Sequence, residues 1–267
     1  MDHGITYTLI TGGSRGIGYA LARECACRGM NLLLVAKPGD GVESAARTLS
    51  EEFPVKVHTL EVDLIELHGP RKVWDWCSEK GYRVDILVNN AGLGGAEVFE
   101  TSPLMYSDER ILLNVRALVL LTQLFLPELK SHTCAYILNI GSISAYFALP
   151  YKAVYAASKA FVRSFSRALR VELADTPVNV TVVHPNGVRT NVGTHERIDT
   201  HSKLTKKLFI LDAEEIAKIT VDKMLKGKLV VIPGFMNRVL LLLSTFLPIS
   251  YMEKRSAAMF IKEVLER

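Results

Sequence analysis

Short apolar runs alternate with amphipathic stretches along most of this 267-residue chain. The runs are almost continuous in Val, Ile and Leu, which is typical of strands covered on both faces of a parallel sheet. They fall at residues 6–10, 31–35, 56–61, 86–88, 135–140, 179–183 and 229–232. The stretches between them have helical spacing and fall at residues 17–28, 42–53, 70–80, 107–130, 155–174 and 213–226. The alternation predicts an α/β fold with a doubly wound sheet of seven parallel strands.

No Pro-, Ser- or Gly-rich linker divides the chain, so we expect one domain over residues 1–267 with a C-terminal helical extension over 233–267. Hydrophobic residues make up 49% and charged residues 22%, which excludes a disordered, collagen-like or coiled-coil chain. The net charge is only +4, and the densest basic run, at 203–207, is short. We therefore expect that run to be solvated and expect no nucleic-acid partner.

The four cysteines show no metal-ligand spacing, so we expect free thiols in a reducing compartment. The chain enters its first strand pattern without a basic leader, which predicts a cytoplasmic protein. A later apolar run at 239–249 is interrupted by Pro248 and is about half of the ~20 residues that span a bilayer. Two interpretations of this run stay open. It is a helix packed on the core or a partner subunit, or it is a substrate lid or peripheral membrane contact.

A glycine-rich segment, TGGSRGIG at residues 11–18, joins the first predicted strand to the first predicted helix. Its glycines allow a tight turn and close approach of a phosphate, and the amides of a helix N-terminus face such an anion. The G-x-x-x-G-x-G spacing differs from the common G-x-G-x-x-G fingerprint, and a simple tight turn is the alternative. The strand before and the helix after favour a dinucleotide site. Its expected residues are Gly12, Ser14, Arg15, Gly16, Ile17 and Gly18.

The end of the second strand indicates which dinucleotide binds. NAD sites commonly place an acid about 20 residues after the glycines to hold the ribose 2′-hydroxyl, whereas this strand ends Val-Ala-Lys-Pro. Lys37 and Arg15 are placed to attract a 2′-phosphate, unless both are only solvated surface cations. The sequence therefore predicts NADP(H) as the cofactor.

Two further strand ends supply candidate cofactor contacts. Asp63, followed by Leu64 just past the third strand, is expected against the adenine amino group. The fourth strand closes with two asparagines, Asn89 and Asn90, followed by Ala91 and Gly92. We expect the asparagines to tie neighbouring loops together and Gly92 to let a ligand approach.

Tyr155 and Lys159 are four residues apart and so share one helix face. A free tyrosine titrates near pH ~10, and a nearby cation lowers that pKa. Tyr155 could then give a proton to a carbonyl oxygen or take one from an alcohol. Ser142, which follows the fifth strand, could hydrogen-bond the same oxygen. Tyr146 and Tyr151 have no lysine at the same spacing, and we expect them to line the pocket or to pack.

In this order and spacing, the motifs resemble those of the classical short-chain dehydrogenase/reductase family over roughly residues 5–232. The matching positions are 11–18, 63, 89–92, 114, 142, 155 and 159. The resemblance implies a Rossmann fold, NAD(P)-dependent carbonyl/alcohol chemistry and no catalytic metal. It implies a homodimer or homotetramer formed through helices 107–130 and 155–174. It also implies that Asn114 joins a water-linked proton relay with Lys159, the alternative being a helix-bending core asparagine.

One position departs from the family pattern. The family commonly has Pro-Gly after the sixth strand, whereas here Pro185 is followed by Asn186. Asparagine tolerates positive φ better than most residues, so we expect the turn to survive. The expected nicotinamide and phosphate contacts here are Pro185, Gly187, Val188 and Thr190. Residues 226–228 and 231–234 are similar to the branch with hydroxysteroid dehydrogenases and long-chain 3-ketoacyl reductases.

These observations leave two function classes. The first is an NADP(H)-dependent oxidoreductase that interconverts a lipophilic ketone and a secondary alcohol. Its small-molecule substrate would be a 3-ketoacyl, keto-sphingoid or steroid-like compound, with residues 186–211 as a lid and 233–252 as an apolar wall. The second is a non-catalytic NADP-binding redox sensor or scaffold. The complete set of Ser142, Tyr155 and Lys159 favours the enzyme, because a sensor needs no such set.

Overall fold

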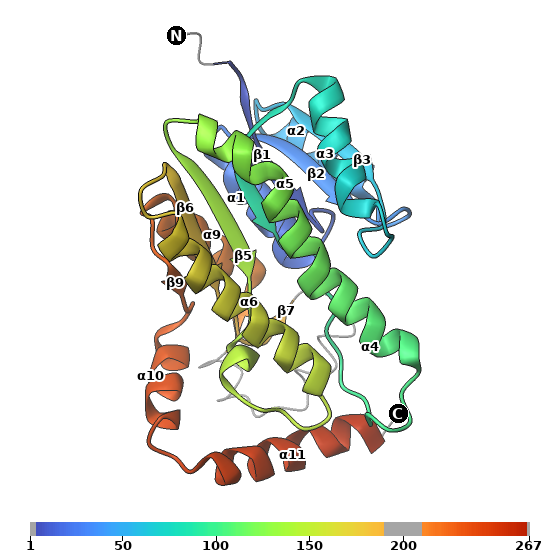
Figure 1. Cartoon of the computed structure of the whole chain (residues 1–267), viewed down its shortest axis with the longest axis vertical. Helices are drawn as coiled ribbons and strands as arrows, with labels where there is room; N and C mark the ends of the chain where they lie inside the picture. The colour runs from blue at the N-terminus through green and yellow to red at the C-terminus, as the bar shows by residue number, and fades with distance from the viewer. Residues whose placement is uncertain (1–3, 190–209, 266–267) are drawn as a thin grey trace.

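The computed structural model describes residues 4–189 and 210–265, and a seven-stranded parallel sheet forms its centre (Figure 1). The strand order is β3-β2-β1-β4-β5-β6-β9. The strands are β1 (Thr6–Thr11), β2 (Asn31–Ala36), β3 (Val57–Glu61), β4 (Arg83–Asn89), β5 (Ala135–Ile140), β6 (Val178–Val183) and β9 (Val230–Val231). The order reverses direction between β1 and β4, as in doubly wound nucleotide-binding folds. The predicted sheet is therefore confirmed.

Two strands differ in length from the sequence prediction by more than one residue. β4 is longer than the predicted 86–88, because it begins at Arg83, and its polar Asp85 interrupts the apolar pattern. β9 is shorter than the predicted 229–232, since it lies at the edge of the sheet and pairs with β6 through only two residues.

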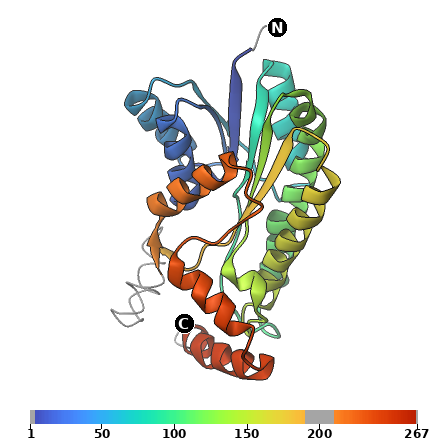
Figure 2. The same ribbon diagram turned by 90° about the vertical axis from the view of Figure 1, so that its left-hand side faces the viewer.

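Helices cover both faces of the sheet (Figure 2). One face carries α1 (Gly16–Cys27), α2 (Val42–Glu52) and α9 (Ala213–Leu225). The other carries α3 (Gly69–Lys80), α5 (Leu118–Ser131) and α6 (Ala153–Glu172). Neighbouring strand residues such as Leu9 and Ile10 are both fully buried, one in each of the two resulting cores. Burial on both faces explains why the strands are continuously apolar.

The predicted helix at 107–130 is three consecutive helical segments. α4 (Leu104–Ile111) runs through a π-helical segment, η1 (Leu112–Ala117), into α5. In the described part of the chain, this continuous helix is the one that passes a test for membrane-spanning length and apolar composition. Its Phe125 and Leu129 are fully buried against the sheet, whereas Leu104 and Met105 at its start are exposed.

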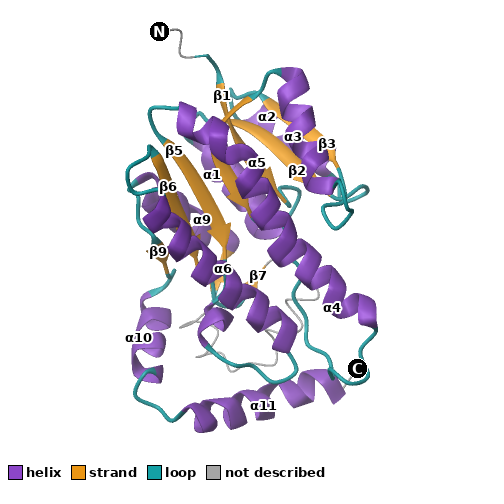
Figure 3. Cartoon of the chain, viewed as in Figure 1, coloured by secondary structure: helices purple, strands orange, loops and turns teal. Residues whose placement is uncertain are grey.

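The C-terminal part of the described chain is helical, as predicted (Figure 3). α10 (Phe235–Ser244) and α11 (Ile249–Leu265) lie beyond the carboxyl ends of the strands, and α11 crosses beneath α6 in Figure 1. The Lys152 ammonium lies 4.2 Å from the Phe260 ring centroid, so α11 contacts the segment that precedes α6. A two-stranded ladder joins β7 (Val188–Arg189) to β8 (Leu211–Asp212). Most of the expected lid at 186–211 lies outside the described residues.

The four cysteines carry free thiols, as predicted. Cys25 and Cys77 are buried, and burial raises the pKa of each thiol to about 12. Those two side chains are therefore unreactive packing residues at neutral pH.

Candidate active site

The glycine-rich turn between β1 and α1 requires its glycines. Gly12 and Gly16 have φ values of 65° and 58°, which other residues rarely adopt. A Cβ on Gly18 would lie 2.0 Å from the Gly12 carbonyl oxygen, so a side chain there would force the turn open. Asn90, which follows β4, holds this turn in place. Its side-chain amide donates to the carbonyls of Thr11 (2.8 Å) and Gly12 (3.1 Å).

Thr11 opens the glycine-rich segment, but the sequence analysis assigned it no contact of its own. Its hydroxyl oxygen accepts hydrogen bonds from the backbone amides of Asn90 and Ala91, each with a length of 3.0 Å. The hydroxyl group donates to the Val88 carbonyl. A threonine at the last position of β1, next to the glycines, was the available signal. Thr11 and Asn90 together fix the two strand ends between which the turn lies.

This turn fits the phosphates of a dinucleotide. α1 begins at Gly16, and the first amides of an α-helix have no acceptor within the helix. The positive φ values and the close approach of Gly18 to Gly12 leave backbone, rather than side chains, lining the turn. Backbone amides at a helix N-terminus are suited to bind an anion such as a pyrophosphate.

The two cations expected at a 2′-phosphate each contact a carboxylate. Arg15 lies 3.2 Å from Asp40, and Lys37 lies 3.0 Å from Asp63. The hydrogen bond to Asp63 raises the pKa of Lys37 above its ordinary value. Lys37 and Asp63, which we expected at different parts of the cofactor, therefore contact each other. Both cationic side chains are more than 60% exposed, and exposed ion pairs are weak, so a phosphate could displace either carboxylate.

The three residues expected to catalyse proton transfer converge at the end of β5. Tyr155 and Lys159 lie on α6, and Ser142 caps a 3₁₀ turn, η2 (Ile143–Tyr146), that follows β5. The Lys159 ammonium donates to the Ile140 carbonyl over 2.8 Å and lies 5.9 Å from the Tyr155 ring centroid. The Ser142 hydroxyl oxygen accepts from the Ser144 amide over 3.1 Å, which fixes its direction.

Burial controls the protonation of this group. It raises the pKa of Tyr155 above 10, against a smaller lowering by hydrogen bonding to Ser142. It lowers the pKa of Lys159 to about 8. The sequence argument, which counted only the lysine charge, predicted a lowered tyrosine pKa, and that prediction is wrong for this state of the chain. Desolvation disfavours the phenolate more than its neighbours favour it, so Tyr155 is a neutral acid at pH 7.

His184 supports Ser142 and was not anticipated from the sequence. It is fully buried, with Nδ1 3.0 Å from the Ser142 carbonyl oxygen. Burial lowers the pKa of His184 to about 4, so the ring is neutral at pH 7. Because a carbonyl oxygen only accepts, Nδ1 carries the proton. A Cβ on Gly141 would lie 2.7 Å from Nδ1, and the Tyr146 ring packs edge-on against the imidazole, as a packing role for Tyr146 requires.

Asn114 lies in the π-helical segment and uses its side chain to hold a loop. Its Oδ1 accepts from the Leu93 amide (2.8 Å), and its Nδ2 donates to the Leu93 carbonyl and the Ser158 hydroxyl (each 3.0 Å). A Cβ on Gly92 would lie 3.0 Å from Asn114 Oδ1 and 3.5 Å from Lys159 Nζ. Gly92 therefore lets the loop pass between the two residues that the expected relay would join.

Asn186 does not use the positive φ that asparagine tolerates. Among the described residues other than glycine, Tyr151 alone has a positive φ (63°). The side chain of Asn186 makes hydrogen bonds that a glycine could not. Oδ1 accepts from the Gly187 amide, and Nδ2 donates to Asn237 Oδ1 on α10, both over 2.9 Å.

The neighbouring residues of this turn have different surroundings. The Pro185 carbonyl accepts from the Ile143 amide over 3.0 Å, which brings the turn beside η2 and Ser142. Val188 is buried in β7. Thr190 lies outside the described residues.

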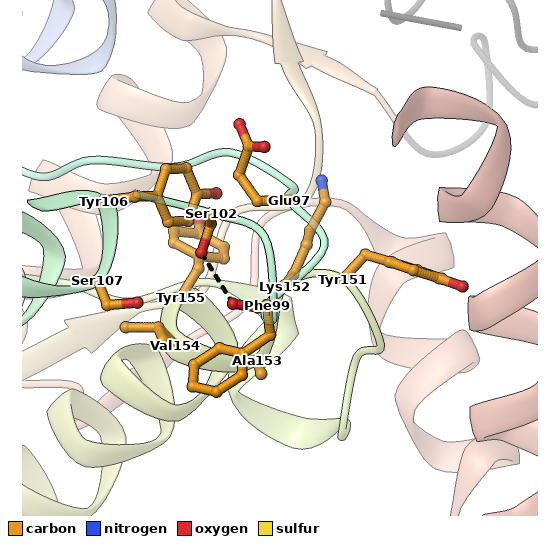
Figure 4. Close-up of a pocket in the computed structure, with 10 residues that line it drawn as sticks. All are labelled: Glu97, Phe99, Ser102, Tyr106, Ser107, Tyr151, Lys152, Ala153, Val154 and Tyr155. Atoms are coloured by element: carbon orange, nitrogen blue, oxygen red, sulfur yellow. Dashed lines mark hydrogen bonds between the residues drawn. The ribbon is translucent and has the colours of Figure 1, made fainter. Parts of the chain in front are cut away.

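A small pocket, open to solvent, lies beside Tyr155 (Figure 4). It is formed by the loop between β4 and α4, the start of α4, and the start of α6. Tyr151 lines it, as expected. The other lining residues are Glu97, Phe99, Ser102, Tyr106, Ser107, Lys152, Ala153, Val154 and Tyr155. Four of these ten residues are aromatic, and two, Glu97 and Lys152, are charged.

A glycine turn at a helix N-terminus and a Ser-Tyr-Lys group, both at the carboxyl edge of one parallel sheet, define an oxidoreductase of the Rossmann type. The comparisons agree. The short chain dehydrogenase family model matches residues 6–200. The chain therefore belongs to the short-chain dehydrogenase family.

Two curated relatives illustrate the range of its similarity. A very-long-chain 3-oxoacyl-CoA reductase of Bos taurus is 32% identical over 78% of this chain and 67% of its own length. Sulfoacetaldehyde reductase 2 of Chromohalobacter salexigens is 35% identical over 79% of this chain and 85% of its own length.

Solved structures show the same fold. A short-chain dehydrogenase from Sphingobium yanoikuyae in complex with NADPH is 30% identical, with a TM-score of 0.77, over 86% of this chain and 88% of that one. A bulky-bulky ketone specific alcohol dehydrogenase from Comamonas testosteroni is 28% identical, with a TM-score of 0.75, over 85% and 86% of the two chains.

Proposed function

We propose that this protein is an NADP(H)-dependent oxidoreductase that interconverts a lipophilic ketone and a secondary alcohol, with Tyr155 as the acid and base. The observation that carries the proposal is the convergence of Ser142, Tyr155 and Lys159 beside the glycine turn. A sensor or scaffold would need the turn but not this group.

The cofactor would lie along the carboxyl edge of the sheet. The amides at the start of α1 bind its pyrophosphate, and Arg15 and Lys37 bind the 2′-phosphate in place of their present carboxylate partners. Asp63 and Leu64 flank the adenine, and the turn from Pro185 holds the nicotinamide end. The NADPH in the structure from Sphingobium yanoikuyae supports this choice. When bound, the nicotinamide supplies or accepts the hydride at the substrate carbon.

The side chains of this chain move the proton. Neutral Tyr155 donates its hydroxyl proton to the carbonyl oxygen, which becomes the alcohol oxygen. Ser142 donates a hydrogen bond to the same oxygen and holds it near the phenol. The Lys159 ammonium stabilises the phenolate left behind, and reprotonation of Tyr155 restores the acid. In the direction of alcohol oxidation, the proton moves the opposite way.

The substrate we favour has a long or bulky apolar part. Phe99, Tyr106 and Tyr151 line the pocket, and α11 contacts the segment before α6. The similarity to a very-long-chain 3-oxoacyl-CoA reductase supports a 3-ketoacyl compound, and keto-sphingoid and steroid-like ketones share its chemistry.

A carbonyl substrate screen tests the function. Purified protein is supplied with NADPH and a panel of ketoacyl thioesters, ketosteroids, 3-ketosphinganine and simple aldehydes, and NADPH oxidation is followed. We expect turnover to rise with the apolar size of the ketone. Tight NADPH binding without turnover on any member would instead support the sensor or scaffold.

The outer faces of α4 and α6 are the surfaces we propose for subunit contact in a homodimer or homotetramer. Leu104 is 91% exposed and Met105 is 63% exposed on α4, and Phe161 and Val171 are exposed on α6. Such apolar side chains on neighbouring helices are typical of an interface. Light scattering on the protein and on Leu104→Glu measures the assembly.

We also propose that the end of α10 and the start of α11 touch a lipid surface from the cytoplasmic side. This C-terminal corner consists of Leu242, Leu243, Phe246, Leu247 and Tyr251, all exposed. No acidic residue occurs from 223 to 252, and exposed basic residues flank the corner on both sides, at 238 and at 254–255. Apolar side chains flanked by cations favour contact with anionic lipid headgroups.

A further inference from the structure

Arg110, the penultimate residue of α4, is a buried cation. It is only 8% exposed, and its guanidinium lies 3.2 Å from the centroid of the Tyr106 ring. Nη1 donates to the Tyr106 carbonyl over 2.6 Å, and Nη2 donates to the Gly94 carbonyl. No carboxylate within the described ranges pairs with it, and its Nε has no hydrogen-bond partner there. The buried charge is therefore used to hold backbone.

Arg110 and Asn114 hold consecutive residues of the same loop. Asn114 binds both backbone groups of Leu93, and Arg110 binds the carbonyl of Gly94. The loop packs directly on the guanidinium, because a Cβ on Gly95 would lie 2.8 Å from Arg110 Nη2. Gly95 also has a φ of 127°, a conformation that other residues rarely adopt. We call residues 93–95, held in this way, the clamped loop.

The clamped loop passes beside the proposed acid. A Cβ added to Gly94 would lie 3.9 Å from Cε2 of the Tyr155 ring, an ordinary van der Waals distance, so the loop leaves room for little more than a methyl group there. Asn114 also donates to the Ser158 hydroxyl, and that hydroxyl donates to the Tyr155 carbonyl over 2.7 Å. The clamped loop therefore lies beside the Tyr155 ring, and Asn114, which holds that loop, is also linked to the backbone of Tyr155 through Ser158.

We infer that Arg110 is a positioning residue for the proposed reaction. By fixing the Gly94 carbonyl, it keeps the clamped loop beside the Tyr155 ring and limits the positions that the phenol can take toward Ser142 and the substrate. An apolar side chain at this position could not donate to the Gly94 and Tyr106 carbonyls, so the loop would lose this restraint. The inference rests on the proposed role of Tyr155.

The experiment compares Arg110→Met with Arg116→Met. Arg116 lies on the same continuous helix and also donates to two backbone carbonyls, those of Glu66 and Leu67, but outside the active site. We measure kcat and KM for the best ketone, NADPH affinity, and amide hydrogen exchange of residues 93–95. Small misplacement of a reacting group costs on the order of 10²-fold in rate.

For Arg110→Met we expect a kcat lower by about 10- to 100-fold, faster exchange in the clamped loop, and unchanged NADPH affinity. Arg110→Lys, which keeps the charge and one donor group, should restore part of the rate. Arg116→Met should match the unaltered protein in kcat and in exchange of the clamped loop. If Arg110→Met does not fold, Arg110→Lys against Arg116→Lys gives the same comparison.

The inference is overturned if exchange in the clamped loop rises while kcat stays the same, or if the two methionine variants behave alike. Loss of NADPH affinity in step with kcat would overturn it as well. The proposed function fails by a different result, which is full turnover by Tyr155→Phe. In that case the clamped loop would have no acid to position, and the inference would fall with it.

Discussion

The side chain of Asn186 donates a hydrogen bond to Oδ1 of Asn237 over 2.9 Å, which joins the turn after β6 to α10. Asn237 is 1% exposed and its own amide donates to the Pro233 carbonyl over 2.9 Å. The family commonly has glycine where this chain has Asn186. The chain thus couples the turn proposed to hold the nicotinamide to its C-terminal extension through a side chain that a glycine lacks.

Asn186→Gly should destabilise the protein by about 0.5–1.5 kcal/mol, since it removes the hydrogen bond from Asn186 to Asn237. NADPH affinity should change little, because glycine suits the turn. Urea unfolding and cofactor titration measure the two effects. The matched control is Asn179→Gly, which removes an asparagine bonded to Arg170 away from the site. Equal stability of Asn186→Gly and the unaltered protein would show that the two elements are not coupled.

Tyr155→Phe should reduce kcat by about 10²–10⁴-fold, because it removes the proton donor and keeps the ring. NADPH affinity should be retained. The control is Tyr151→Phe, since Tyr151 lines the same pocket without a lysine partner and should keep most of the rate. Activity of Tyr155→Phe near that of the unaltered protein would mean that another group supplies the proton.

Lys37→Asp should weaken NADPH binding much more than NADH binding, because it places a negative charge beside Asp63 where a 2′-phosphate is proposed to lie. The control is Lys72→Asp on α3, which breaks a similar exposed ion pair with Glu66. Titration of both cofactors into each protein makes the comparison. Equal affinities for NADPH and NADH in the unaltered protein would show that Lys37 and Arg15 do not bind the 2′-phosphate and are only surface charges.

The stability of the protein should depend on the titration of Lys159. Its folded pKa is about 8 and its ordinary value is 10.5, so between these values the unfolded chain binds more protons than the folded one. The free energy of unfolding then rises with pH across that window, by about 3 kcal/mol in total. The difference between the protein and Lys159→Met, measured by urea unfolding, should follow this curve. A difference that is constant from pH 7 to 10.5 would contradict it.

Leu242→Ser combined with Phe246→Ser should abolish sedimentation with vesicles that contain anionic lipid and leave the assembly state unchanged. Both side chains are exposed at the C-terminal corner, and Phe246 is 78% exposed. Leu104→Ser should do the reverse, since Leu104 belongs to the proposed subunit contact on α4. If the double variant changes only the assembly state, the corner is a subunit interface. No vesicle binding by the unaltered protein would exclude the lipid surface.

The sequence was sufficient for the sheet, since strands buried on both faces must be apolar throughout, as Leu9 and Ile10 show. It also indicated the glycine turn and the Tyr155–Lys159 pair, because each follows from local spacing. It could not give the contacts that depend on packing between distant segments. His184 lies beneath Ser142 only because β5 and β6 are neighbours, and the bond from Asn186 to α10 spans 51 residues.

The direction of the Tyr155 pKa shift could not be predicted from the sequence either, because desolvation depends on what surrounds the phenol in the fold. Likewise, Arg110 looks like an ordinary helix-surface cation until the loop from Leu93 folds over it.

The π-helical segment at Leu112–Ala117 makes the active site sensitive to chain length. An α-helix turns about 100° per residue, so one deletion within this segment would leave a continuous helix whose two ends face different directions than before. Either Phe125 would leave the core or Arg110 and Asn114 would leave the clamped loop. A single-residue deletion in this segment would therefore preserve either the packing of Phe125 or the contacts with the clamped loop, but not both.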